Sequence, residues 1–256
     1  MTIQLLPQIY ILIFLLILGL IIGSFLNVVI YRLPRGASLI VPRSSCANCG
    51  RVLGVFDLIP VAGYIMLKGR CRYCRVPISS RYPLGELLAA VIIIFTYLTF
   101  NFSPLFIKYT VIFYILQVIS FIDLEKYIIP NRLVLLLLLW SLIWQFLYPT
   151  IPLAAAGLGL LAGAGLFLLI AVLSKGGMGG GDVKLMAVLG LTAGWPLVLV
   201  VFMLAFLLGA AVGVFFLLTG KKTRRDPLPF APFLSLSFIL STLWGLQLWQ
   251  WYMRHL

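Results

Sequence analysis

The stretch "QIYILIFLLILGLIIGSFLNVVIY", residues 8–31, contains no charged residue and is long enough to cross a bilayer as one helix. A helix needs about 20 consecutive apolar residues for that crossing. The rest of the chain has the same character, since 63% of its 256 residues are hydrophobic and only 10% are charged. A soluble domain has about half apolar and about a quarter charged residues. The sequence therefore predicts a protein that crosses the membrane several times.

Further apolar runs follow along the chain. One of them, at 183–194, comes after a group of glycines and is too short for a full crossing, so that helix is tilted, buried among other helices or re-entrant. Together the runs predict an all-α polytopic integral membrane protein with about eight transmembrane helices. The remaining runs are 84–100, 104–122, 133–149, 152–173, 196–219 and 232–253.

The first run has the features of an uncleaved helix whose N-terminus lies outside. No Lys or Arg precedes it, it is longer than the apolar core of a signal peptide, and the first basic residue, Arg32, follows it. Eight spans that start outside place every Lys and Arg except Lys108 and Arg254 on the inner side. This is the positive-inside distribution, and we expect the basic loops to contact anionic membrane lipids. It accounts for the net charge of +13 without a nucleic-acid partner.

All four cysteines lie in the one long polar segment, residues 32–83. They form two Cys-x-x-Cys pairs, which supply four thiolates for one tetrahedral Zn²⁺ in a cytoplasmic loop. Four sulfur ligands leave no open coordination position, so we expect a structural metal that stabilises a loop too small for its own core. The alternatives are disulfides, which need an oxidising compartment, and a dithiol redox centre, which usually uses one such pair. The predicted ligands are Cys46, Cys49, Cys71 and Cys74.

Four of the six acidic residues have contexts that suggest local roles. Asp226 lies among cations and Glu125 precedes a basic loop, so both are expected to be solvated. Asp57 lies in the cysteine segment, where it either caps a helix or lies at an interface. Glu86, at the start of the second span, either pairs with Arg81 or contacts a substrate.

Asp123 and Asp182 differ from these, because each marks the end of a predicted membrane helix on the same inner face. Asp123 ends the third span, and Asp182 opens the short run after the glycines. Ionisable groups near hydrocarbon are costly and indicate a functional site, although helix N-termini also favour Asp. Two carboxylates held close together share a proton, so that one activates water and the other polarises a carbonyl. This is the chemistry of an aspartic protease, and two unrelated helix-end charges are the alternative.

Glycines precede Asp182 in the stretch "GGMGGGD", residues 176–182. They have no side chains to obstruct an extended peptide next to the carboxylate, and they permit positive φ. The alternative is a flexible linker, but a linker has no reason to end in Asp at a membrane interface. The glycines concerned are Gly176, Gly177, Gly179, Gly180 and Gly181.

In these motifs the chain resembles the type IV prepilin leader peptidases, which are bifunctional peptidase–N-methyltransferases. The matching stretches occur in order over most of the chain. One departure is Ala47, where many relatives have proline, and we expect it to leave metal binding intact. Besides the two cysteine pairs, the matching stretches are "GSFLNVVIYRLPRG" (23–36), "GRCRYCRVPISSRYPLGELL" (69–88), "DLEKYIIPNRL" (123–133), "GMGGGDVKLMAVLG" (177–190) and "FAPFLSL" (230–236).

The resemblance implies that Asp123 and Asp182 are the catalytic pair and that Gly179, Gly181 and Lys184 belong to the supporting motif. It implies a multi-pass protein of the bacterial inner membrane with its active site on the cytoplasmic side. The substrate would be a type IV prepilin or a type II secretion pseudopilin, cut after the glycine that ends a short basic leader. The new N-terminal residue, usually Phe, would then be N-methylated with S-adenosylmethionine.

The site for S-adenosylmethionine is not assigned to residues, because no glycine-rich nucleotide motif follows a strand. We expect it to be built from the inner loop and the helix ends. Since a basic leader is repelled by the basic loop, Glu86 and Asp57 are the candidate substrate contacts. The expected organisation is a first transmembrane helix at 1–31, a zinc-binding loop associated with methyl transfer at 32–83, and a peptidase core at 84–256.

Three other functions share parts of this pattern. A peptidase without methyl transfer would keep both aspartates, but the cysteine loop argues against it. A transporter would have acids deep within its spans and inverted repeats between its halves, whereas the key acids here lie at one interface. A zinc protease would need a His-Glu-x-x-His motif, and the only histidine is His255.

Overall fold

The computed structural model describes residues 5–174, 177–221, 223 and 226–255. Gly176 and the basic residues Lys175, Lys222, Arg224 and Arg225 lie outside the described residues. Within the described part, the regular structure is helical, and β-pairing is limited to two isolated bridges in the cysteine segment. The prediction of an all-α protein is confirmed.

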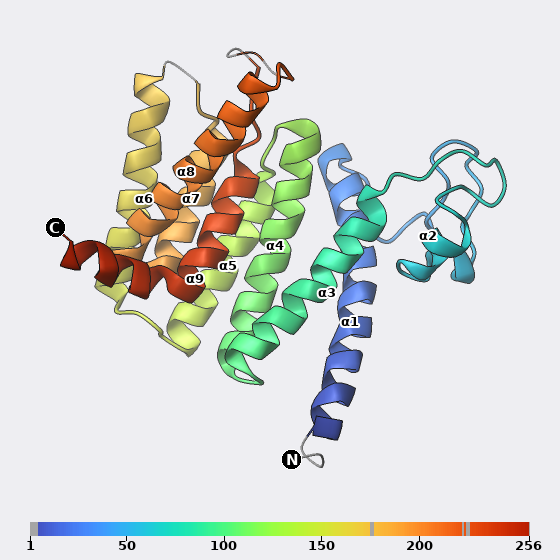
Figure 1. The fold of residues 1–256 in the computed structure, drawn as a ribbon, viewed down its shortest axis with the longest axis horizontal. Helices are drawn as coiled ribbons and strands as arrows, with labels where there is room; N and C mark the ends of the chain where they lie inside the picture. The colour runs from blue at the N-terminus through green and yellow to red at the C-terminus, as the bar shows by residue number, and fades with distance from the viewer. Residues whose placement is uncertain (1–4, 175–176, 222, 224–225, 256) are drawn as a thin grey trace. The chain divides into compact units, whose positions relative to one another are not determined.

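The chain forms two compact units, Met1–Tyr114 and Ile115–Leu256, and the boundary between them falls within α4 (Figure 1). The first unit contains α1 (Leu5–Arg32), η1 (Leu33–Arg35), η2 (Val55–Leu58), α2 (Ala62–Met66), α3 (Arg81–Phe100) and the beginning of α4 (Pro104–Lys126). The second contains the end of α4, α5 (Asn131–Leu147), α6 (Leu153–Leu173), α7 (Gly180–Ala193), α8 (Leu197–Leu218) and α9 (Ala231–Arg254).

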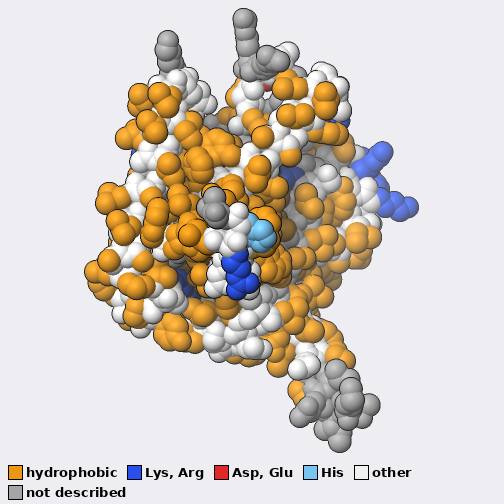
Figure 2. Space-filling model, turned by 60° about the vertical axis from the view of Figure 1, so that its left-hand side comes forward, with side chains coloured by type: hydrophobic (Ala, Val, Ile, Leu, Met, Phe, Trp, Pro, Cys, Tyr) orange, Lys and Arg blue, Asp and Glu red, His pale blue; other side chains and the backbone are white. Residues whose placement is uncertain are grey.

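Six of the described helices are long and apolar enough to cross a membrane, namely α1, α3, α4, α6, α8 and α9. α5 is a shorter apolar helix of 17 residues, and α7 has only 14 residues. Each predicted apolar run corresponds to one of these helices, with ends that differ by a few residues. Hydrophobic side chains cover most of the face shown in Figure 2, as expected for a surface in contact with lipid.

In the first unit, α1 and α3 approach each other closely at two glycines of α1. A Cβ atom on Gly19 would lie 2.5 Å from the Cα of Ala90, and one on Gly23 would lie 2.6 Å from the Cα of Glu86. Glycines four residues apart on one helix face allow this approach between membrane helices. The backbone of α3 at Glu86 is therefore packed directly against α1.

In the second unit, α6 and α7 pack in the same way. A Cβ atom on Gly159 would overlap the carbonyl oxygen of Gly190, and one on Gly163 would lie 2.6 Å from the carbonyl oxygen of Met186. Seven of the 14 residues of α7 are buried, so this short helix is enclosed by its neighbours. Among the alternatives predicted for the short run, the structure supports the buried helix.

Candidate active site and metal centre

Asp123 lies in the last turn of α4, inside the helix rather than after it. The helix ends at Lys126. The following residue, Tyr127, has a φ of 56° and donates its N–H to the carbonyl of Asp123 at 2.9 Å. Asp123 is only 5% exposed. Its Oδ2 accepts a hydrogen bond of 3.0 Å from the N–H of Ala231, the first residue of α9. The carboxylate thus lies at the positive end of a second helix.

The stretch "FAPFLSL", one of the stretches that carry the family resemblance, forms the start of α9. Pro232 lies in the first turn of that helix, where proline is favoured. The ring of Phe230 lies 5.2 Å from that of Phe206 and 6.0 Å from that of Phe167, measured between centroids. These ring contacts hold the start of α9, whose first N–H donates to Asp123. The proline was the only sequence signal for this support.

Asp182 lies in the first turn of α7, and its N–H donates to the carbonyl of Gly179 at 3.1 Å. Its side-chain Oδ1 is buried and has no hydrogen-bond partner among the described residues. Burial raises the pKa of Asp182 to about 7, and the negative charge of Asp123 acts in the same direction. The two carboxylates are therefore near enough to interact by charge. An unpaired carboxylate oxygen beside a second carboxylate is able to share a proton with it.

The glycines before Asp182 serve close packing. A Cβ atom on Gly181 would lie 2.9 Å from the Cβ of Ile129, in the connection between α4 and α5. A Cβ atom on Gly179 would lie 3.1 Å from Oδ2 of Asp182, whereas one on Gly180 would meet nothing within 4 Å. Gly179 has a φ of −71°, and Gly180 and Gly181 lie within α7, so these three do not use the left-handed backbone that glycine permits. Contact with neighbouring atoms is the reason for glycine at 179 and 181.

Lys184, which the resemblance assigns to the supporting motif, is exposed on α7. Its Nζ donates a hydrogen bond of 3.0 Å to the side-chain oxygen of Asn131, the first residue of α5. The first turn of α7 is therefore tied to the start of α5. Together with Gly181 and Ile129, this bond fixes α7 against the segment that follows Asp123.

The four cysteines form one cluster in the first unit. The sulfur atoms of Cys46, Cys49, Cys71 and Cys74 all lie within 4.8 Å of one another. The Cys46 and Cys74 sulfurs are 3.7 Å apart, close to the edge of about 3.8 Å expected for a tetrahedron with Zn–S bonds of 2.3 Å. The donor set and its spacing fit one tetrahedral metal ion.

The two cysteine pairs lie in two separate turns that have the same backbone conformation. Each turn is closed by its own isolated bridge. The N–H of Cys46 donates to the carbonyl of Arg51, and the N–H of Cys71 donates to the carbonyl of Val76, both at 2.9 Å. The residue after each pair has a positive φ, 70° at Gly50 and 59° at Arg75. The two turns are thus equivalent, and they present their sulfurs to a common point.

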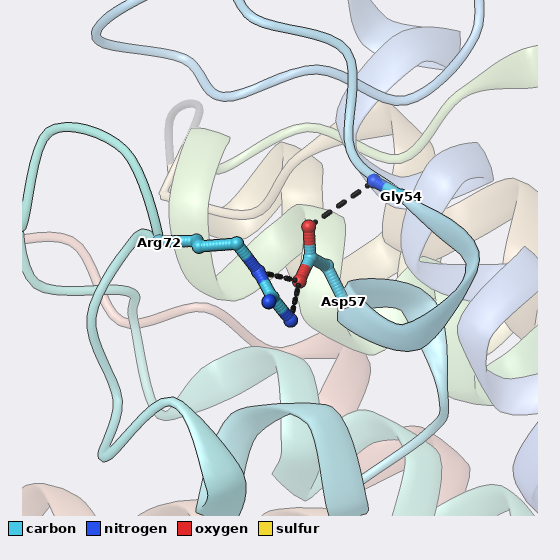
Figure 3. A network of polar contacts seen from close by, with 3 residues as sticks. All are labelled: Gly54, Asp57 and Arg72. Atoms are coloured by element: carbon cyan, nitrogen blue, oxygen red, sulfur yellow. Dashed lines mark hydrogen bonds and ion pairs between the residues drawn. The ribbon is translucent and has the colours of Figure 1, made fainter.

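Asp57 is bound within the cysteine segment (Figure 3). Its Oδ1 accepts hydrogen bonds from Nε and Nη2 of Arg72 at 2.8 and 2.7 Å, and its Oδ2 accepts one of 3.1 Å from the N–H of Gly54. The side chain of Asp57 is 3% exposed, compared with 51% for Arg72. The geometry supports the capping role, and substrate contact by Asp57 stays a prediction.

Glu86 lies near the start of α3 and is 8% exposed. Its Oε2 accepts a hydrogen bond of 2.7 Å from the N–H of Val61, which precedes α2 and has a φ of 60°. That conformation is unfavourable for a β-branched residue, so the carboxylate holds a strained corner of the loop. Substrate contact by Glu86 likewise stays a prediction.

The remaining acids and the histidine lie on exposed parts of the chain, as predicted for the two carboxylates. Glu125 is exposed at the end of α4, and His255 is exposed after α9. Asp226 is exposed and accepts hydrogen bonds from the N–H and the hydroxyl of Thr223 at 2.6 and 2.9 Å.

Two protein-family models match the chain, one in each half. The bacterial peptidase A24 N-terminal domain matches residues 17–100, and the type IV leader peptidase family matches residues 110–214. The first range contains the cysteine cluster and Glu86, and the second contains both Asp123 and Asp182. No solved structure was found to match the chain.

Curated relatives extend the similarity over nearly the whole chain. Proteins named prepilin leader peptidase/N-methyltransferase from Aeromonas hydrophila and Bacillus subtilis (strain 168) are each 35% identical, over 93% and 94% of this chain and 92% and 97% of their own. The protein of that name from Pseudomonas aeruginosa is 32% identical over 93% of this chain and 92% of its own. The chain belongs to the type IV leader peptidase family.

Proposed function

We infer that this protein is a membrane-embedded aspartic peptidase that removes the basic leader of type IV prepilins or pseudopilins, and an N-methyltransferase that modifies the new N-terminus. The observation that carries this conclusion is the interacting carboxylate pair, Asp123 and Asp182, in a unit related to leader peptidases. The names of the relatives and the cysteine cluster support this bifunctional enzyme over a peptidase without methyl transfer.

In the proposed cleavage, Asp123 acts as the base and Asp182 as the acid. The pair shares one proton, which we assign to Asp182 because burial and the charge of Asp123 raise its pKa to about 7. Asp123 takes a proton from a water molecule, whose oxygen attacks the scissile carbonyl carbon, while the protonated Asp182 donates to the carbonyl oxygen. The C–N bond then breaks as the proton on Asp123 passes to the leaving amine, and Asp182 takes back the proton on the carbonyl oxygen, which restores the C=O bond and the shared proton. The N–H of Ala231 orients Asp123 during both transfers.

The rate of cleavage is expected to decrease as the pH rises through about 7. The reaction needs a protonated Asp182, whose pKa is about 7. Above that value, the protonated fraction decreases about tenfold per pH unit. Initial rates of prepilin cleavage, measured between about pH 5.5 and about pH 9, record this decrease. The variant Asp226→Asn, which changes an exposed carboxylate, should leave the profile unaltered. A rate that stays constant up to the highest pH would contradict the assignment of Asp182 as the acid.

We propose Zn²⁺ as the ion held by Cys46, Cys49, Cys71 and Cys74. When bound by four thiolates, it has no open coordination position, so its contribution is to join the two cysteine turns. The equivalent backbone of the two turns and the tetrahedral spacing of their sulfurs support this structural role.

S-adenosylmethionine is the proposed methyl donor and supplies an electrophilic methyl group to nitrogen. The amine released by cleavage has to lose its proton first, because its lone pair forms the new N–C bond. The exposed parts of the cysteine segment and the adjoining helix ends are the proposed location of this reaction, without assignment to individual residues.

The proposed location of the protein is the bacterial cytoplasmic membrane, with both reactions on the cytoplasmic side. The exposed residues Lys126 and Lys184 lie close in sequence to Asp123 and Asp182. Basic residues concentrate on the cytoplasmic side of membrane proteins, which supports this orientation for the carboxylate pair.

Replacement of Gly181 by alanine is expected to reduce cleavage by about 10- to 100-fold, because small displacements of catalytic groups have effects of that size. The new Cβ would lie 2.9 Å from the Cβ of Ile129 and would push the first turn of α7 away from the segment after Asp123. Gly180→Ala is the matched control, since a Cβ there meets nothing within 4 Å. Equal rates for the two variants, measured in one prepilin assay, would rule out this role for Gly181.

The proposed function is tested by intact mass spectrometry of a prepilin incubated with the purified protein and S-adenosylmethionine. The expected product lacks the leader and carries one added methyl group at its new N-terminus. A product without the methyl group would identify a peptidase alone. Failure to cleave any prepilin or pseudopilin would contradict the proposed function.

A further inference from the structure

Two short helices in the cysteine segment have their apolar side chains outside and their charged group inside. η2 and α2 contact each other. Asp57 of η2 points inward to Arg72 and Gly54 (Figure 3), and Gly63 of α2 packs against the carbonyl of Asp57. The outward side chains, which we call the apolar patch, are Val55, Phe56, Ile65 and Met66, with exposures of 81%, 71%, 67% and 69%. Large apolar side chains grouped in this way on a surface mark an interaction site.

The corner between η2 and α2 is tied to a membrane helix, at a residue more than one turn after the start of α3. Val61 donates its N–H to the buried carboxylate of Glu86, a residue whose backbone Cα packs against Gly23 of α1. At 1.5 Å per residue, Glu86 lies about 8 Å along α3 from its start, and Gly23 lies about 13 Å before the end of α1. Arg81 and Arg32 stand at those helix ends, where charged residues mark the membrane surface. Val61 is therefore tied to a residue that lies further into the membrane helix than Arg81 does.

The charges next to the apolar patch complement an anionic surface. Lys68 and Arg70 follow α2 directly, and both are exposed. The only acidic residue between α1 and α3 is Asp57, whose carboxylate is already paired with Arg72. An exposed apolar face bordered by cations is the composition of a segment that lies in the interface of an anionic bilayer.

We propose that the apolar patch inserts into the lipid leaflet beside α1 and α3, with Lys68 and Arg70 among the anionic headgroups. The hydrogen bond between Val61 and Glu86 sets the depth of insertion, because it ties the strained corner to a membrane helix. The cysteine cluster lies in the same loop, directly before and after this pair of helices in the sequence. It is consequently held at the membrane surface by the lipid contact. This inference does not depend on the activity proposed above.

The insertion is tested with the full-length protein reconstituted into nanodiscs of phosphatidylglycerol. An environment-sensitive fluorescent amino acid replaces Phe56 in one preparation and Ala47 in another, as a control at an exposed position in the first cysteine turn. Quenching is measured with doxyl-labelled lipid and with aqueous iodide. We expect doxyl lipid to quench position 56 about fivefold more than position 47, and iodide to show the reverse order, because an interfacial segment lies about 5–10 Å into the leaflet. Phosphatidylcholine nanodiscs, or the double variant Lys68→Gln/Arg70→Gln, should reduce the lipid quenching at position 56.

Three results would overturn the proposal. Quenching of position 56 by iodide but not by doxyl lipid would place the apolar patch in water. Protection of position 56 from both quenchers would mean that protein covers it, from the rest of this chain or from a second copy. Equal lipid quenching of position 56 in both lipids, and in the double variant, would contradict the proposed contact of Lys68 and Arg70 with anionic headgroups.

Discussion

The variants Asp123→Asn and Asp182→Asn are each expected to reduce prepilin cleavage by about 10⁴-fold, the upper range for loss of a general acid or base. Asparagine has the shape of aspartate but neither accepts nor releases a proton in these steps. Because the two carboxylates act as one unit on a shared proton, the double variant should be little worse than either single variant. The measurement is the initial rate of leader removal at saturating enzyme, followed by gel shift or mass.

Glu125→Gln is the matched control for these variants. Glu125 lies on the same helix as Asp123, two positions further on, and it is exposed. Its replacement by glutamine also removes one negative charge but leaves both Asp123 and Asp182 in place. The cleavage rate should therefore stay near that of the unchanged protein. Substantial cleavage by either asparagine variant, or losses that multiply in the double variant, would argue against a shared-proton mechanism.

Cys71→Ser is expected to release the metal and abolish methyl transfer. Cys71 is the most buried of the four predicted ligands, and it is 3% exposed. Four-ligand zinc sites contribute about 10–16 kcal/mol of apparent binding free energy, which also stabilises the surrounding fold. We therefore expect metal content to fall from about one ion per chain to near background. Cleavage should decrease less than methyl transfer, because neither Asp123 nor Asp182 belongs to the cysteine segment.

Ala47→Ser serves as the control for the metal site, since it introduces the same hydroxyl between two ligands without removing a thiolate. Metal content by elemental analysis and methyl transfer by mass are measured on both variants. Removal of the metal by a chelator should reproduce the loss in Cys71→Ser, and added Zn²⁺ should reverse it only in the unchanged protein. Full metal content in Cys71→Ser would show that the cysteines do not form the predicted site.

Hydropathy located the helices but misplaced some of their ends. The apolar run 104–122 stops just before Asp123, whereas α4 continues to Lys126. Likewise α3 begins at Arg81, before the apolar run at 84. Apolar character reports contact with lipid, while the end of a helix depends on backbone hydrogen bonds. The last turn of α4 is polar and still helical, so Asp123 is held rigidly by the helix.

Local patterns in the sequence predicted the membrane helices, the two cysteine pairs and the two candidate catalytic aspartates, because each depends on neighbours only a few positions away. The tertiary structure alone decided which distant groups meet them. The Ala231 N–H reaches Asp123 from the start of another helix, and Ile129 explains glycine at 181 but not at 180. Val61 is likewise held by Glu86 from outside its own segment. These contacts depend on how helices pack in three dimensions, which no short stretch of sequence records.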